Sequence, residues 1–108
     1  MKKLLLLFML FSNITFAHIA ITHFNAEWNK ANDVSWFMDL KDCKTKGHTD
    51  IGKNPDIAKE HKIAVVPTII LFKDGEEVAR FQADLSFKML ATKEEVQEEI
   101  DNQLMSDF

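Results

Sequence analysis

Cysteine is the residue type that could do redox chemistry, and the chain has one, Cys43. A single thiol cannot form an intramolecular disulfide or cycle with a second thiol of the same chain. Lys41, Lys44 and Lys46 are close to it in sequence, and nearby positive charge lowers the pKa of a thiol. Two interpretations stay open: a half-buried thiol at a helix end, or a reactive thiol that forms a mixed disulfide with another molecule in an oxidising compartment.

Histidine is the residue type here that most readily binds metal ions, and the chain has four of them, His18, His23, His48 and His61. They are spread over different predicted elements, with no His-x-His or His-x-x-x-His pair. Metal centres usually bring together ligands at short fixed spacings. The sequence therefore predicts no metal and no other cofactor, and His23 is expected in or near the core.

Composition restricts the class of protein and the class of partner. The chain has 108 residues, enough for one small domain, and is 46% hydrophobic and 28% charged, which is typical of a globular chain. The net charge of −4 argues against nucleic acid and anionic membranes as partners. The expected partner is an unidentified protein or an extended peptide.

Residues 1–17 have the three-part pattern of a secretory signal peptide. Lys2 and Lys3 are followed by an unbroken apolar run and then by Ala17 at the expected cleavage position. The apolar run is too short to span a bilayer, which needs about 20 residues. Cleavage would leave a domain of residues 18–108, beginning at His18, in the periplasm or outside the cell, with no stable membrane insertion. The alternative is that this run forms a buried strand or helix of the domain.

Hydropathy patterns predict an α/β domain with the order strand, helix, strand, helix, hairpin, helix. The predicted strands are residues 19–24, 48–51, 68–72 and 77–83, and the predicted helices are residues 29–40, 55–61 and 92–104. Asp74-Gly75 is a strong signal for a two-residue hairpin turn between the last two strands. Because the first three strands are joined by long connections, we expect them to be parallel, with the hairpin adding an antiparallel edge to a four-stranded mixed sheet.

Short signals mark where the helices begin. Asn29 is expected to cap the first helix by accepting hydrogen bonds from its first turn. Asn54 followed by Pro55 is typical of the start of a second helix. Thr92 and Glu95 have the spacing of a capping box, which predicts the start of the last helix.

Four segments of the chain resemble the thioredoxin family. They are Ala26-Glu27-Trp28 before the first predicted helix, Asn54-Pro55, the stretch 63–68 that ends in Val66-Pro67-Thr68, and the stretch 71–76. The resemblance covers about residues 19–104 and implies a minimal thioredoxin-like domain. It also implies that Pro67 is a cis proline beside the active-site groove.

The departures from the family concern its chemistry. Thioredoxins carry two cysteines separated by two residues in the loop that is Trp28-Asn29-Lys30-Ala31-Asn32 here, so Asn stands at both cysteine positions. The family's usual buried Asp is replaced by His23. Disulfide exchange needs a thiolate, which an amide cannot supply. The resemblance therefore implies a degenerate active-site loop and no thiol–disulfide oxidoreductase activity.

These residues indicate three alternative functions. The first is a non-catalytic module in which Val66, Pro67 and Thr68 pair with an extended peptide, flanked by Trp28, Asn29 and Asn32. The second is a thiol–disulfide role through Cys43 alone. The third is a structural or assembly subunit that uses an apolar link, Leu85, Phe87, Met89 and Leu90, as an exposed patch. The simpler interpretations are a helix cap for Asn29, a position in the first helical turn for Asn32, packing for Trp28, and packing of the link against the last helix.

Overall fold

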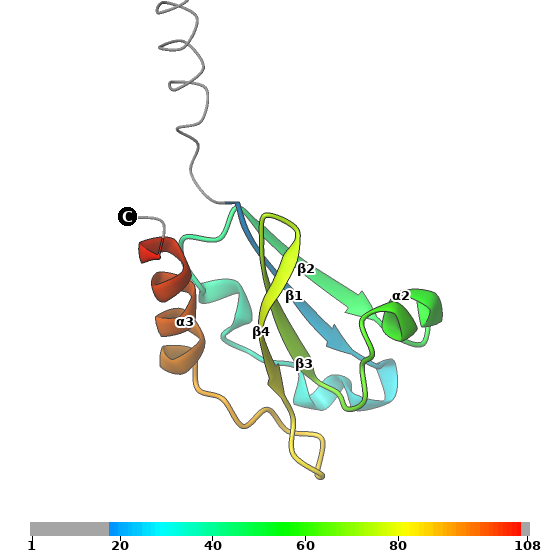
Figure 1. The fold of residues 1–108 in the computed structure, drawn as a ribbon. Helices are drawn as coiled ribbons and strands as arrows, with labels where there is room; N and C mark the ends of the chain where they lie inside the picture. The colour runs from blue at the N-terminus through cyan, green and yellow to red at the C-terminus, as the bar shows by residue number, and fades with distance from the viewer. Residues whose placement is uncertain (1–17, 107–108) are drawn as a thin grey trace, which may run out of the picture.

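Four strands form one mixed sheet in the computed structural model, which describes residues 18–106. The predicted signal peptide lies outside the described residues. The strands are β1 (Ile19–Asn25), β2 (Thr45–Asp50), β3 (Thr68–Lys73) and β4 (Glu76–Gln82). Their order across the sheet is β2-β1-β3-β4, so β1 and β3 are the central strands. Figure 1 shows α3 on one side of this sheet and α2 on the other.

The direction of β3 corrects the sequence-based prediction. β1 and β2 are parallel as expected, but β3 runs antiparallel to β1, and β4 is antiparallel to β3. Thr68 at the start of β3 pairs with Phe24 near the end of β1. α2 (Pro55–Glu60) has six residues and is only ~9 Å long, too short to carry the chain back along a strand. The third strand therefore begins where the first one ends and has to run back beside it.

The largest difference from the predicted elements is the helix expected over residues 29–40. The chain forms two 3₁₀ segments instead, η1 (Glu27–Asn32) and η2 (Phe37–Asp39), with Asp33 extended between them. Asn and Asp side chains compete with the backbone for hydrogen bonds and so interrupt helices. Here the amide of Asn25 donates to Asp33 Oδ1, and Asn29 has non-helical backbone angles inside η1. These polar contacts break the segment that hydropathy spacing alone predicts to be one helix.

Two local predictions are confirmed. Asp74 and Gly75 form the hairpin turn with φ values of 52° and 87°, the left-handed region that a tight two-residue turn requires. α3 (Lys93–Met105) begins with the capping box, in which Glu95 N donates to Thr92 Oγ1 at 3.1 Å and the Glu95 side chain returns to the Thr92 N–H. Asn54 is different: it precedes Pro55 at the helix start, but its side chain makes no capping bond.

The hydrophobic core lies between the sheet and the elements that cover the α3 side. Its members come from β1, the segment 34–40, β3 and α3: Ile19, Ile21, Val34, Phe37, Leu40, Ile69, Leu71, Val96 and Ile100. On the other side of the sheet, the His61 ring at the end of α2 lies between the rings of Phe24 and Phe72. η1 follows the end of β1, and the Asn29 amide in η1 reaches the Val66 carbonyl just before β3, so the predicted site residues meet at this end of the sheet. None of the helices among residues 18–106 has the length and hydrophobicity needed to cross a bilayer.

Candidate functional site

The predicted degenerate loop and the predicted groove lie side by side at one end of the sheet. η1 follows β1 directly and carries Trp28, Asn29 and Asn32. The peptide bond between Val66 and Pro67 is cis, as the resemblance implies, and it leads into β3. Thr68 is fully buried and its hydroxyl donates to the Val65 carbonyl at 2.6 Å, so its side chain serves the loop rather than the surface.

Asn29 joins three segments of the chain through one amide group. It is only 4% exposed, and its Nδ2 lies 3.0 Å from Asn25 Oδ1, 3.3 Å from the Val66 carbonyl oxygen and 3.2 Å from the Phe87 carbonyl oxygen. Its side chain makes no capping bond at the start of η1, so the predicted cap was wrong. The reason is that its Nδ2 faces Asn25, Val66 and Phe87 and its Oδ1 accepts from the Asn32 side chain, so the amide does not bond to a backbone N–H of the first turn.

Asn25, Asn32 and Asp33 complete a polar network around Asn29. Asn32 Nδ2 donates to Asn29 Oδ1 at 2.8 Å, and Asn25 Nδ2 donates to the Asn29 carbonyl at 3.1 Å. Asn25 also donates to Asp33 Oδ1. The sequence-based prediction of the site did not include Asn25, although a buried amide directly after an apolar strand is a signal that could have identified it. A network with every buried member paired stabilises one arrangement of the loop.

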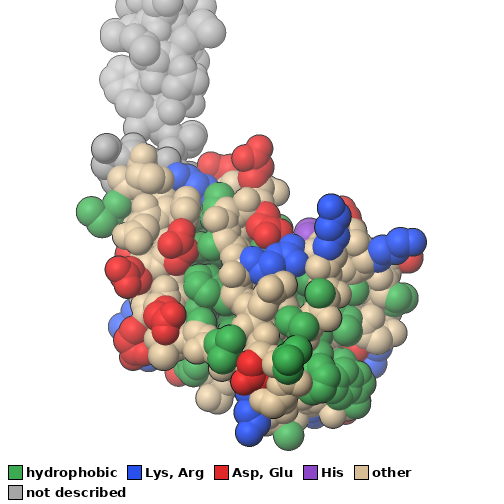
Figure 2. Space-filling model, turned by 60° about the horizontal axis from the view of Figure 1, so that its bottom comes forward, with side chains coloured by type: hydrophobic (Ala, Val, Ile, Leu, Met, Phe, Trp, Pro, Cys, Tyr) green, Lys and Arg blue, Asp and Glu red, His purple; other side chains and the backbone are tan. Residues whose placement is uncertain are grey.

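Trp28 and Phe87 form the outer wall of an apolar groove. The Trp28 side chain is 68% exposed and meets Phe87 edge to face, with ring centroids 5.1 Å apart. A hollow of about 110 Å³ is lined by both rings and by Ile51, Ile63, Ala64, Val65 and Val66. Hydrophobic side chains gather on the surface of this end of the molecule (Figure 2). The arrangement suits an apolar side chain of an extended peptide.

Part of the apolar link packs against the domain and part of it is exposed, so each of its two interpretations applies to some of its residues. Met89 packs against the core, as the packing interpretation predicts. Leu85, Phe87 and Leu90 are exposed, and Leu85 is 93% accessible to solvent. The backbone contact between Ala83 and Met89 closes a small turn over residues 84–88, so Leu85 and Phe87 project from a hydrogen-bonded turn and Leu90 follows it.

His23 and His48 form a buried-to-surface pair on neighbouring strands. Val34 N donates to His23 Nε2 at 3.2 Å, so the proton of neutral His23 must be on Nδ1. That Nδ1 lies 3.3 Å from His48 Nδ1, which then accepts. Burial, followed by the charge of His48, lowers the pKa of His23 from 6.5 to about 4, against the opposing effect of Asp33. His23 is therefore a neutral core histidine, as expected.

The histidines do not form a metal site with their neighbours. Within residues 18–106, no three His, Cys, Asp or Glu side chains are arranged to hold a metal ion. His61 is on the opposite side of the sheet from His23, between Phe24 and Phe72.

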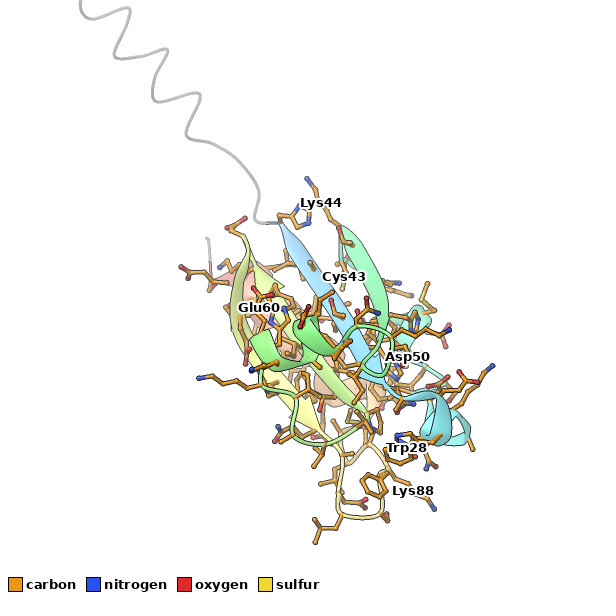
Figure 3. The ribbon with its side chains drawn as sticks, turned by 90° about the vertical axis from the view of Figure 1, so that its right-hand side faces the viewer. Trp28, Cys43, Lys44, Asp50, Glu60 and Lys88 are labelled. Atoms are coloured by element: carbon orange, nitrogen blue, oxygen red, sulfur yellow. The ribbon has the colours of Figure 1, made fainter. Side chains whose placement is uncertain are left out.

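Cys43 lies at the other end of the sheet from the loop. Lys44 N bonds to the carbonyl of Ile19 at the start of β1, whereas Trp28 follows the end of that strand (Figure 3). The thiol is half-buried and packs against the core. Lys46 lowers the pKa of this thiol, as expected of a nearby lysine, but burial has the larger effect and raises it, so the net shift is upward and does not favour a reactive thiol.

We expect Cys43 to react slowly with iodoacetamide at pH 7.5. The raised pKa leaves less thiolate than in an ordinary cysteine, and the half-buried position limits access. The alkylation rate followed by mass spectrometry should be lower than that of glutathione, and unfolding in urea should increase it. A native protein that reacts faster than glutathione would contradict this prediction.

Known proteins share this fold and part of this sequence. No protein-family model matches the chain. A stretch of 51 residues is 47% identical to the chloroplastic thioredoxin Y1 of Arabidopsis thaliana, and this match spans 47% of the chain but 30% of that protein.

Solved structures give a broader overlap. Thioredoxin from Schistosoma mansoni superposes with a TM-score of 0.63 at 23% sequence identity. The match covers 89% of the present chain and 85% of the Schistosoma chain. A mutant thioredoxin from Halobacterium salinarum NRC-1 superposes with a TM-score of 0.62 at 21% sequence identity. This match covers 80% of the present chain and 74% of the Halobacterium chain. The chain has the thioredoxin-like α/β fold with a four-stranded mixed sheet, which confirms the fold implied by the sequence resemblance.

Proposed function

We propose that this chain is a thioredoxin-fold module that binds an extended peptide or protein segment and does not catalyse disulfide exchange. The observation that carries the proposal is the apolar groove between Trp28, Phe87 and the cis-proline loop, next to a loop that contains no thiol. An extended peptide would pair with the Val66 N–H, for which residues 18–106 offer no backbone acceptor, and insert one apolar side chain into the hollow.

Two features support binding rather than redox chemistry. Asn29 and Asn32 cannot become thiolates, and their amides already bond to each other. Cys43 is remote from the groove and has a raised pKa, which disfavours a thiol–disulfide role for it. With dithiothreitol supplying the electrons, we therefore expect insulin disulfides to be reduced no faster than by dithiothreitol alone, and the same result for Cys43→Ser. Turnover that Cys43→Ser abolishes would favour the thiol role instead.

Peptide binding itself can be measured with a designed series. The probes are acetylated Gly-Ser-Xaa-Ser-Gly peptides in which Xaa is Leu, Phe, Lys or Asp, and the readout is ¹H–¹⁵N NMR titration. The Leu and Phe peptides should shift the Val66 amide and the Trp28 indole, whereas the Lys and Asp peptides should not. Trp28→Ala should weaken binding about tenfold or more, because exposed aromatic anchors dominate such interfaces.

The control for this experiment is an exposed apolar side chain elsewhere. Met105 is 70% exposed at the end of α3, and Met105→Ala should leave the affinity unchanged. Self-association in analytical ultracentrifugation that is lost in Leu85→Ser would instead favour an assembly subunit, because Leu85 is the most exposed large apolar side chain of the link. Failure of all four peptides to shift the groove amides would overturn the proposal.

The cell envelope is the proposed location. The support is the charge, apolar run and Ala17 pattern of residues 1–17. Expression of the full chain in a bacterium should yield a periplasmic product that begins at His18, which N-terminal sequencing would identify. A cytoplasmic product that begins at Met1 would contradict this location.

A further inference from the structure

The side-chain amide of Asn29 connects two chain segments that border the groove, here called its rims. The first rim is the cis-proline loop, through the Val66 carbonyl, and the second is the turn over residues 84–88, through the Phe87 carbonyl. Asn29 Nδ2 lies within hydrogen-bond distance of both oxygens, which are separated from it by 37 and 58 residues in sequence. At their base the rims are also joined by the backbone hydrogen bond from Ala83 N to the Pro67 carbonyl, at 3.0 Å. Further out, the side chain of Asn29 in η1 supplies the polar link between the Val66 and Phe87 carbonyls.

The orientation of this amide is fixed by its neighbours. Asn29 Oδ1 accepts from Asn32 Nδ2, so the nitrogen has to face the other way, toward Val66 and Phe87. Asn25 Oδ1 is a third acceptor for the same nitrogen, so its two hydrogens have more acceptors than they can fully satisfy. The amide is therefore held in one position by the surrounding protein groups.

Phe87 has a backbone conformation that needs outside support. Its φ is 64°, in the left-handed region that bulky residues rarely adopt. Within the turn, Phe87 N donates to the Asp84 carbonyl, and Asp84 Oδ1 accepts from Ser86 N and Lys88 N. Two contacts connect Phe87 to the groove itself: the hydrogen bond from Asn29 and the edge-to-face contact with Trp28.

We propose that Asn29 is a positioning residue that fixes the separation of the two rims and so presets the groove for its peptide. This inference rests on the proposed peptide-binding function. A groove whose walls are already fixed loses less conformational freedom on binding than one whose walls must be ordered by the ligand. The residue at the family's first cysteine position thus sets the shape of the binding surface without contacting the peptide.

The variant that tests this is Asn29→Asp, which has nearly the same shape but replaces the donor with a carboxylate facing two carbonyl oxygens. The affinity for the Leu peptide should fall about tenfold, because both hydrogen bonds to the rims are lost. Even without peptide, Trp28 fluorescence should change in a Trp36→Phe background, because Phe87 is no longer held against the indole. Hydrogen exchange of the Phe87 amide should also become faster.

A matched control separates positioning from general loss of stability. Val96 is fully buried in α3, away from both rims, so Val96→Ala should destabilise the domain yet keep the peptide affinity within about twofold. If Asn29→Asp does not fold, Asn29→Ser provides the same comparison, since its hydroxyl is too short to reach both rims.

The outcomes distinguish the two proposals. Unchanged affinity and unchanged Trp28 fluorescence in a folded Asn29 variant would overturn the positioning role while leaving peptide binding intact. Absence of peptide binding by the unmodified protein would overturn the binding function. In that case the fluorescence and hydrogen exchange of the free protein would still decide whether Asn29 holds the rims together.

Discussion

Lowering the pH from 7 to 4 is expected to destabilise the folded domain by about 3 kcal/mol through His23 alone, given a pKa of 6.5 in the unfolded chain and about 4 in the fold. The unfolded chain binds the proton first, so stability is complete above pH 6.5 and falls as the pH decreases toward 4. The physical cause is burial of the imidazole in the core, with His48 adding repulsion.

The hydrogen bonds of His23 also predict that protonating it destabilises the fold. A proton on Nε2 would remove the acceptor of the Val34 N–H, a bond that holds the segment between η1 and η2 to β1. Urea unfolding at a series of pH values measures the effect, and His23→Gln is the control because it cannot titrate. The carboxylates with lowered pKa, Glu77 and Asp84, contribute in a lower pH range and are common to both proteins. Equal pH dependence in the two proteins would show that His23 does not act this way.

Phe37→Ala is expected to cost about 4 kcal/mol in the free energy of unfolding, the usual effect of removing a fully buried aromatic ring. Phe37 is inaccessible to solvent, and its ring lies 5.5 Å from that of His23 and 5.0 Å from that of His48, centroid to centroid. The variant would leave a cavity between η2 and the sheet. In a domain this small, such a loss is a large share of the total stability.

The neighbouring residue provides the control. Met38 is 59% exposed, so Met38→Ala should change the free energy of unfolding by no more than about 0.5 kcal/mol. The hydropathy spacing of the predicted helix does not distinguish these two residues, whereas the 3₁₀ segment buries one and exposes the other. Similar losses in both variants, measured by urea unfolding, would contradict the observed packing of η2.

Elements whose signals lie within a few residues could be predicted. The capping box of Thr92 and Glu95 specifies where α3 begins, because both partners belong to the same turn. Asp74 and Gly75 specify the hairpin, because they accept positive φ values that few other residue pairs tolerate. The cis bond before Pro67 and the absence of thiols from the loop likewise follow from the sequence and its family resemblance.

The central part of the site was decided by contacts between distant segments. From the sequence, Asn29 is predicted to be a helix cap, but its amide donates to carbonyl oxygens that are 37 and 58 residues away. A local sequence pattern does not include residues so distant. The same holds for the direction of β3, which depends on Thr68 meeting the end of β1.

The sequence by itself determined the class of fold, the last helix, the hairpin and the lack of a cysteine pair, because residue type and short spacing specify these features. Only the tertiary structure decided that residues 29–40 are not one helix, that Phe87 forms a wall of the groove, and that Asn29 joins its rims. The physical reason is that buried amides take whichever partners the folded chain brings within reach, and those partners lie far away in sequence.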